Sequence, residues 1–150
     1  MLKTLNRLYS VQWGNDEIAI AHDYWWNNRN TKSYVFNPSQ YKEKVRIIFD
    51  RNYQDAYSDP GNFIEEENEN NRDVLAFNGD QLYMEGDGQT KDGKRPFISL
   101  FSLKTGKSKK IYVIENKNEY KQISRIVDIK KGTILTSVET PSKYPNYYLE

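Results

Sequence analysis

A four-strand pattern recurs along this chain, and it constrains the fold more than any other feature of the sequence. Apolar and polar residues alternate in short runs, which is typical of β-strands with one buried face. Hairpins of matching layout begin at Val11, Leu75 and Val127, each with a three-residue turn before its second strand. Their starts are 64 and 52 positions apart. Repetition at such a period predicts similar structural units in series.

Two more strand-like runs follow each of the first two hairpins. They cover 31–36, 45–49, 97–103 and 110–114. Ile47 and Ile111, inside the fourth runs, are again 64 positions apart. Four antiparallel strands form one blade of a β-propeller. We therefore expect an all-β fold and a partial β-propeller of four-stranded antiparallel blades, with blades at about 9–50 and 73–114, an inter-blade loop at 51–72 and a partial blade at 123–150.

The third unit is incomplete in the sequence, because a third strand only begins at Pro145–Glu150. Two full blades and an incomplete third cannot close a ring, since a propeller has roughly four to eight blades. Open blade faces and edge strands favour association. We therefore expect the polypeptide to continue past Glu150 and the truncated chain to self-associate. The alternative is a self-contained sandwich or meander of about eleven short strands.

Composition excludes several classes of function. Lys and Arg number 22 and Asp and Glu number 21, so the net charge of +1 provides no field that attracts nucleic acid or an anionic membrane. Cysteine is absent, which excludes disulfides and thiolate metal sites. No apolar run is long enough to span a bilayer, and residues 1–7 lack the apolar segment of a secretion signal. The sequence does not determine the localisation of the parent protein, and an exported, periplasmic parent is compatible with it.

Few side chains are arranged for chemistry. His22 is the only histidine, and the sequence shows no activated serine to accompany it, so a structural or surface role is favoured. Glu85, Asp87 and Asp92 lie in a stretch that misses the spacing of a calcium loop, and a polar hairpin loop is favoured there. The acidic run at 65–71 is typical of a solvated loop. We predict no catalytic residue, no metal site and no cofactor in this chain.

Three residues after the first hairpin are candidates for contact with a substrate. The rings of Trp25 and Trp26 could stack on a sugar ring or a peptide side chain, and Arg29 could pair with an acidic group. The alternatives are packing between neighbouring blades for the two tryptophans and a structural or solvated role for the arginine. We name Trp25, Trp26 and Arg29 as substrate-channel candidates.

A series of motifs, in order, spans most of the chain. They are Trp13–Ile20 with Trp25 and Arg29–Thr31, then Phe49–Arg51, Asp55–Gly61, Gly93–Phe97, Phe101–Lys107 and Pro145–Leu149. Together they resemble part of the N-terminal β-propeller of the prolyl oligopeptidase family of serine peptidases, in its glutamyl endopeptidase-like and dipeptidyl aminopeptidase-like branch. The run from Tyr57 to Gly61 is the most specific of these motifs, whereas a segment such as Leu103–Gly106 occurs in many propellers.

The resemblance implies a propeller that caps a C-terminal α/β-hydrolase domain with a Ser-Asp-His triad. None of that triad maps onto this chain, and no Gly-x-Ser-x-Gly nucleophile elbow occurs in it. The expected function is therefore a propeller segment that gates the access of peptides to a hydrolase domain absent from this chain. Its expected partners are that domain of the same parent protein and peptide substrates. The alternative is a non-catalytic propeller module that binds protein or carbohydrate, because propellers carry many functions.

Overall fold

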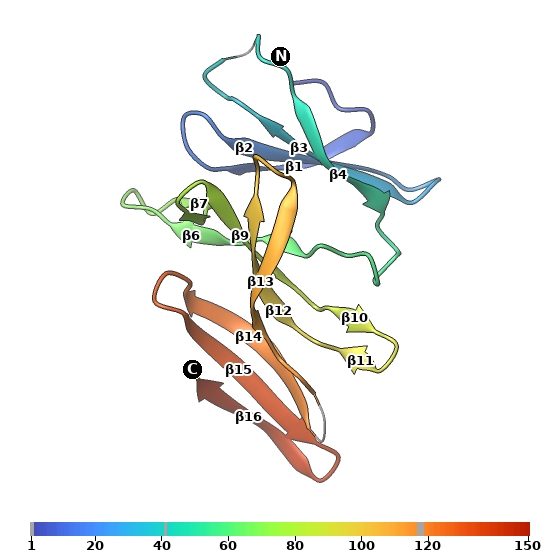
Figure 1. Cartoon of the computed structure of the whole chain (residues 1–150), viewed down its shortest axis with the longest axis vertical. Helices are drawn as coiled ribbons and strands as arrows, with labels where there is room; N and C mark the ends of the chain where they lie inside the picture. Colours follow the sequence, from blue (N-terminus) through green and yellow to red (C-terminus); the bar gives the residue numbers. More distant parts are fainter. Residues whose placement is uncertain (1, 41, 117–118) are drawn as a thin grey trace.

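The computed structural model describes residues 2–40, 42–116 and 119–150. These residues form sixteen β-strands, paired antiparallel, and no helix, so the described part of the chain has no helix that could cross a membrane. The expected all-β fold with antiparallel sheets is confirmed. Three main sheets follow one another along the long axis of the molecule, and the described residues do not close into a ring (Figure 1).

The first sheet contains four strands in chain order. They are β1 (Arg7–Trp13), β2 (Ala19–Trp25), β3 (Asn30–Phe36) and β4 (Arg46–Asn52). The first hairpin is closed by the N–H groups of Gly14 and Asn15, which both donate to the carbonyl oxygen of Ile18. This hairpin was predicted from the sequence. Its second strand begins two residues later than expected and runs on to Trp25, so the aromatic residues lie at the end of a strand.

The second sheet is also four strands wide. Its order is β13 (Lys107–Val113), β12 (Phe97–Ser102), β9 (Gln81–Gly86) and β5 (Asn62–Phe63). A further short strand, β8 (Phe77–Asn78), pairs with the other half of the same edge of β9. The two short strands β5 and β8 therefore together occupy the edge of β9 that a single longer strand would otherwise pair with. Between β9 and β12 the chain forms a small hairpin of β10 (Gln89–Thr90) and β11 (Gly93–Lys94), as expected for a polar hairpin loop.

The acidic run between β5 and β8 begins with a strand of a hairpin, which corrects the expectation of a loop, although none of the residues 65–71 is buried. Strand β6 (Glu65–Glu67) pairs antiparallel with β7 (Asp73–Leu75). The stretch 51–72, expected to be a loop, thus contains the end of β4 and the strands β5 and β6. At the base of the hairpin, Ile64 and Ala76 are buried among apolar residues of the second and third sheets. These two buried residues anchor the β6–β7 hairpin, whose charged and polar residues would otherwise favour exposure to solvent.

The third sheet has three strands, β14 (Tyr120–Asp128), β15 (Thr133–Thr140) and β16 (Lys143–Leu149). The last of these is a complete strand rather than the mere beginning of one, because it pairs with β15 along its whole length. The side chain of Glu150 accepts a hydrogen bond from the Tyr112 hydroxyl at 2.9 Å and pairs with Lys121. The contact with Tyr112 connects Glu150 to the second sheet, whereas Lys121 belongs to β14 of the third sheet.

Two apolar clusters join the three sheets. The first lies between the first and second sheets and includes Ile20, Leu82 and Phe101, all fully buried. The second lies between the second and third sheets and includes Tyr83 and Ile134. The first and third sheets thus each pack one face against the second sheet, which is buried on both faces.

The connections between strands define two ends of the molecule. One end, at the right of Figure 1, carries the β2–β3 turn, the long β4–β5 connection, the β10–β11 hairpin and the β15–β16 turn. In an antiparallel sheet every second connection lies at the same end, so each sheet contributes a turn or a loop to this side of the molecule. We call it the loop end. It positions the candidate site.

Candidate functional site

A cleft of about 630 Å³ opens at the loop end between the first sheet and the segment that leads into the second. Its volume lies within the range of about 300–1,000 Å³ that is typical of ligand pockets. The floor is formed by all four strands of the first sheet, and the opposite wall is the segment 59–65. The residues that line it are Tyr9, Ser10, Val11, Gln12, His22, Thr31, Ser33, Phe49, Arg51, Tyr53, Asp59, Pro60, Gly61, Asn62, Phe63 and Glu65.

The cleft exists because one face of the first sheet changes from apolar to polar along its strands. Ile20 and Val35 lie opposite each other in β2 and β3 and pack in the first apolar cluster. Two residues further along each strand, on the same face, His22 lies opposite Ser33. These polar side chains line the cleft, and the two sheets separate where the apolar contact ends.

A chain of hydrogen bonds crosses the floor of the cleft. The side-chain amide of Gln12 donates to the carbonyl oxygen of Phe63 at 3.3 Å, so its Oε1 faces the histidine. Nε2 of His22 is 2.9 Å from this Oε1, and Nδ1 is 2.9 Å from Oγ of Ser33. An amide oxygen only accepts, so Nε2 carries the proton and the Ser33 hydroxyl donates to Nδ1. The chain links three strands of the first sheet to β5.

The environment keeps His22 neutral at pH 7. Burial lowers the pKa of His22 below its ordinary 6.5, and the nearby Asp23 carboxylate opposes this shift only in part. A serine hydroxyl held by an imidazole is one element of nucleophilic catalysis. Here, however, the far nitrogen is held by a neutral amide, and Ser33 is only 8% exposed. The arrangement therefore has a structural role, since it connects the strands of the first sheet to β5. Ser33 is a partner of His22 that was not predicted from the sequence.

Arg51 lies at the mouth of the cleft. Its Nη2 donates to the carbonyl oxygen of Asp55 at 2.6 Å and is 3.4 Å from Oδ2 of Asp59. Its Nε is buried without a hydrogen-bond partner in the structure. Arg51 thus has a structural role, as part of an ion pair with Asp59. The guanidinium holds the β4–β5 connection against the sheet.

A smaller cleft of about 270 Å³ shares Asp59, Gly61 and Asn62 with the first. It is also lined by Glu85, whose pKa is raised by burial and, secondarily, by the Asp87 carboxylate. Asp87 itself forms an ion pair with Lys94 at 2.6 Å. Within the ranges that the structure describes, no group of three or more His, Asp or Glu side chains is placed to hold a metal ion.

The three substrate-channel candidates lie at the loop end but outside the cleft. Trp25 and Trp26 are 42% and 62% exposed at the β2–β3 turn. The Arg29 guanidinium donates to the carbonyl oxygen of Trp26 and lies 5.9 Å from the centre of that indole ring. The carbonyl oxygen of Arg29 accepts from the N–H of Tyr53, which lines the cleft. The structure thus brings the three candidates together beside the rim.

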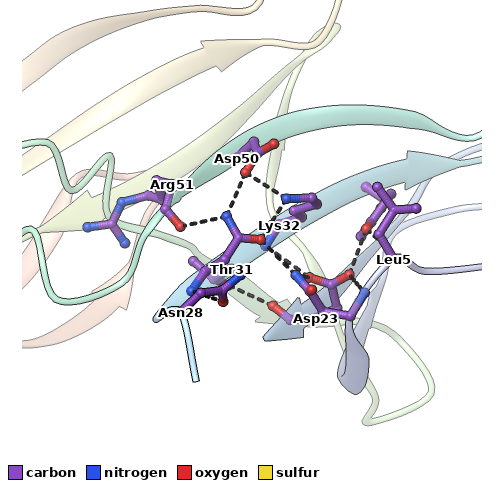
Figure 2. A network of polar contacts seen from close by, with 10 residues as sticks. Leu5, Asp23, Asn28, Thr31, Lys32, Asp50 and Arg51 are labelled. Carbon is purple, nitrogen blue, oxygen red and sulfur yellow. Dashed lines mark hydrogen bonds and ion pairs between the residues drawn. The ribbon is translucent and has the colours of Figure 1, made fainter. Parts of the chain in front are cut away.

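On the opposite face of the first sheet lies a polar network that sequence reasoning missed (Figure 2). Asp23 is fully buried, and its carboxylate accepts hydrogen bonds from the Tyr34 hydroxyl at 2.6 Å and from the backbone N–H of Lys32 at 3.0 Å. Both the backbone and the side-chain amide of Asn6 also donate to it. Burial, with the bond to Asp23, raises the pKa of Tyr34 to about 12. The network fixes the N-terminal segment to the sheet.

Two curated proteins are similar to this chain along nearly its whole length. The chain is 27% identical over 157 aligned positions to a protein of Oryza sativa subsp. japonica named "Probable glutamyl endopeptidase, chloroplastic". It is 28% identical over 158 positions to a protein of the same name from Arabidopsis thaliana. The chain is therefore similar to a segment of each of these two proteins. Each alignment covers 96% of this chain but only 17% and 16% of the two relatives. No protein-family profile and no solved structure matches the chain.

Proposed function

We propose that this chain is part of the N-terminal β-propeller of a serine peptidase of the prolyl oligopeptidase family. The observation that carries the proposal is similarity along nearly the whole chain to proteins named glutamyl endopeptidase, of which it spans about one sixth. Two successive sheets that are each four strands wide, and that pack face to face, support it. In this proposal the first, second and third sheets are the blades at about 9–50, 73–114 and 123–150.

The proposed role is to gate the access of peptides to a catalytic domain. The loop end supplies the surface for this role, because four connections from the three sheets lie along it (Figure 1). It combines two clefts with the exposed rings of Trp25 and Trp26 and with Arg29. These side chains would contact an extended peptide on its way to the active site. The proposed partners are the α/β-hydrolase domain of the same parent protein and the peptide substrates.

The chemistry in this proposal is acyl transfer performed by residues of the hydrolase domain. A serine attacks the peptide carbonyl, a histidine carries the proton to the leaving amine, and backbone N–H groups hold the oxyanion. We expect the coding sequence downstream of Glu150 to encode a Gly-x-Ser-x-Gly elbow followed by an aspartate and a histidine. A stop codon after further four-strand units would contradict the peptidase proposal.

We predict that the isolated chain is catalytically silent. The reason is that the hydroxyl of Ser33 is nearly inaccessible and His22 lacks a carboxylate partner on its far nitrogen. The measurement is incubation of the purified chain with glutamyl peptides and, separately, with a serine-directed phosphonate probe. No turnover and no covalent labelling are expected. Stoichiometric labelling that Ser33→Ala abolishes would show an active serine in this chain.

A second candidate function is a binding module for carbohydrate. Trp26 is 62% exposed at a turn, and an exposed indole ring is a common platform for a sugar ring. Titration of oligosaccharides with tryptophan fluorescence distinguishes the two candidates. Saturable quenching that is lost in Trp26→Ala would favour the binding module over the peptidase segment.

A further inference from the structure

The hydrogen-bond donors at the centre of the floor of the large cleft are already bound within the protein. The side chains of Gln12, His22 and Ser33 use their donors in the chain of hydrogen bonds described above. The hydroxyl of Thr31, which also lines the cleft, donates to the carbonyl oxygen of Asp23 at 2.7 Å. A ligand that needs donors from the protein would therefore find few of them on this floor.

The opposite wall supplies acceptors instead. Asp59 and Glu65 stand at the two ends of this wall, and both line the cleft. The Asp59 carboxylate is 3.4 Å from Nη2 of Arg51, longer than a good hydrogen bond. Glu65 is exposed, and among the described residues its side chain has no hydrogen bond or ion pair. With His22 neutral, the lining residues carry one positive and two negative charges, so the cleft is negative although the whole chain is +1.

A β-bulge places an aromatic ring at the same cleft. The register between β1 and β2 shifts between Leu8 and Ser10, so Tyr9 has no residue opposite it. Bulges redirect side chains at the edges of sheets. The Tyr9 ring centre lies 6.0 Å from that of His22 and 5.5 Å from that of Tyr24. Tyr9 lines the cleft and is still 59% exposed, so part of its ring is available to a ligand.

We propose that this cleft binds a basic side chain, lysine or arginine, of a peptide that passes the loop end. The inference rests on the proposed function, because that function brings peptides to this end of the molecule. The ring of Tyr9 attracts a cation, and the carboxylates of Asp59 and Glu65 accept its N–H groups. The methylene groups of the ligand would pack on Phe49 and Phe63, which both line the cleft.

Other ligands fit the cleft less well. An acidic side chain would meet two carboxylates, and the single guanidinium is already bound by the carbonyl oxygen of Asp55 and by Asp59. A metal ion is not favoured, since in the part of the chain that the structure describes no three acidic or histidine side chains are placed to hold one. An uncharged side chain could enter, but it would leave the carboxylate of Glu65 without a partner. The charge of the ligand is therefore the quantity to test.

Three peptides of equal length test this on the unmodified chain. Each is acetylated and amidated at its ends and carries one lysine, norleucine or glutamate among glycines. Chemical-shift titration of the isotope-labelled chain at low ionic strength measures each dissociation constant. We expect the lysine peptide to bind at least about tenfold more tightly than the norleucine peptide, because only the ammonium group meets the rings and carboxylates. Equal affinity of these two peptides, or no saturable binding of the lysine peptide, would overturn the proposal.

Glu65→Gln removes the unpaired carboxylate and keeps the shape of the side chain. We expect it to reduce the preference for lysine over norleucine by about threefold to tenfold. The matched control is Glu67→Gln, because Glu67 lies on the same strand, is also exposed and does not line the cleft. Equal losses in the two variants would show a general field of the acidic hairpin and would overturn the site. Tyr9→Leu should weaken the lysine peptide more than the norleucine peptide, since leucine retains apolar contact without a π face.

The outcome is distinguishable from that of the proposed function. A Gly-x-Ser-x-Gly elbow downstream of this chain, without a preference for lysine, would keep the peptidase proposal and reject the basic subsite. A preference for lysine that Glu65→Gln lowers and Glu67→Gln does not, in a parent without the elbow, would keep the site and assign it to a binding module.

Discussion

At the scale of single residues, His22 gives the chain a pH dependence of defined sign. Its pKa is lowered in the folded protein by burial, so the unfolded chain takes up the proton first as the pH falls below 6.5. We therefore expect its contribution to stability to be present above pH 6.5 and to be lost as the pH falls through the lowered pKa. Urea unfolding at about pH 7.5 and about pH 5.5 measures this, because histidine titrates between them.

His22→Gln is the control for this prediction, because glutamine retains a donor and an acceptor but does not titrate in this range. The pH dependence should be smaller in the variant than in the unmodified chain. Glu85 does not mimic the effect, because its raised pKa gives a stability change of the opposite sign. The same pH dependence in both proteins would show that His22 is not its source.

At the scale of elements, the β4–β5 connection depends on one glycine. Gly61 has a φ of +89°, and a Cβ there would lie 2.1 Å from the carbonyl oxygen of Glu85 in β9. We expect Gly61→Ala to lower the free energy of unfolding by about 1–3 kcal/mol or more, because strain and a backbone clash act together. Gly79→Ala is the matched control, since its φ is +61° but no atom lies within 4 Å. Thermal unfolding should show the larger loss for Gly61, and equal losses would contradict the clash.

At the scale of the whole molecule, the interface between the first two sheets depends on an aromatic cluster. Phe101 is fully buried, with ring centres 5.0 Å from Phe49 and 5.9 Å from Phe63. We expect Phe101→Ala to cost about 3–5 kcal/mol, a large share of the roughly 5–15 kcal/mol of a typical domain. Urea unfolding followed by circular dichroism measures the loss. Tyr144→Ala, 91% exposed, should change stability little, and equal effects of the two would contradict a shared core.

Local pattern in the sequence determined the strand content of this protein. Alternating residues around Ile20, Leu82 and Ile134 predicted three hairpins, because burial of one face imposes a period of two on any strand. The tight turns were also recognisable locally, because such turns need residues that tolerate positive φ angles, and Gly79 and Gly132 adopt them. The acidic hairpin of β6 and β7 was not recognisable, because its strands form through pairing and through the burial of Ile64 and Ala76.

The tertiary structure decided which residues meet. Gln12, His22 and Ser33 lie far apart in the sequence. Only the register of β1, β2 and β3 brings them into one hydrogen-bonded chain. In the same way, Asp59 and Glu85 border a common cleft because β5, which follows Asp59, pairs with β9 and places Asn62 opposite Glu85. The physical reason is that hydrophobic periodicity is local and can be read along the chain, whereas register and sheet packing depend on contacts between distant residues.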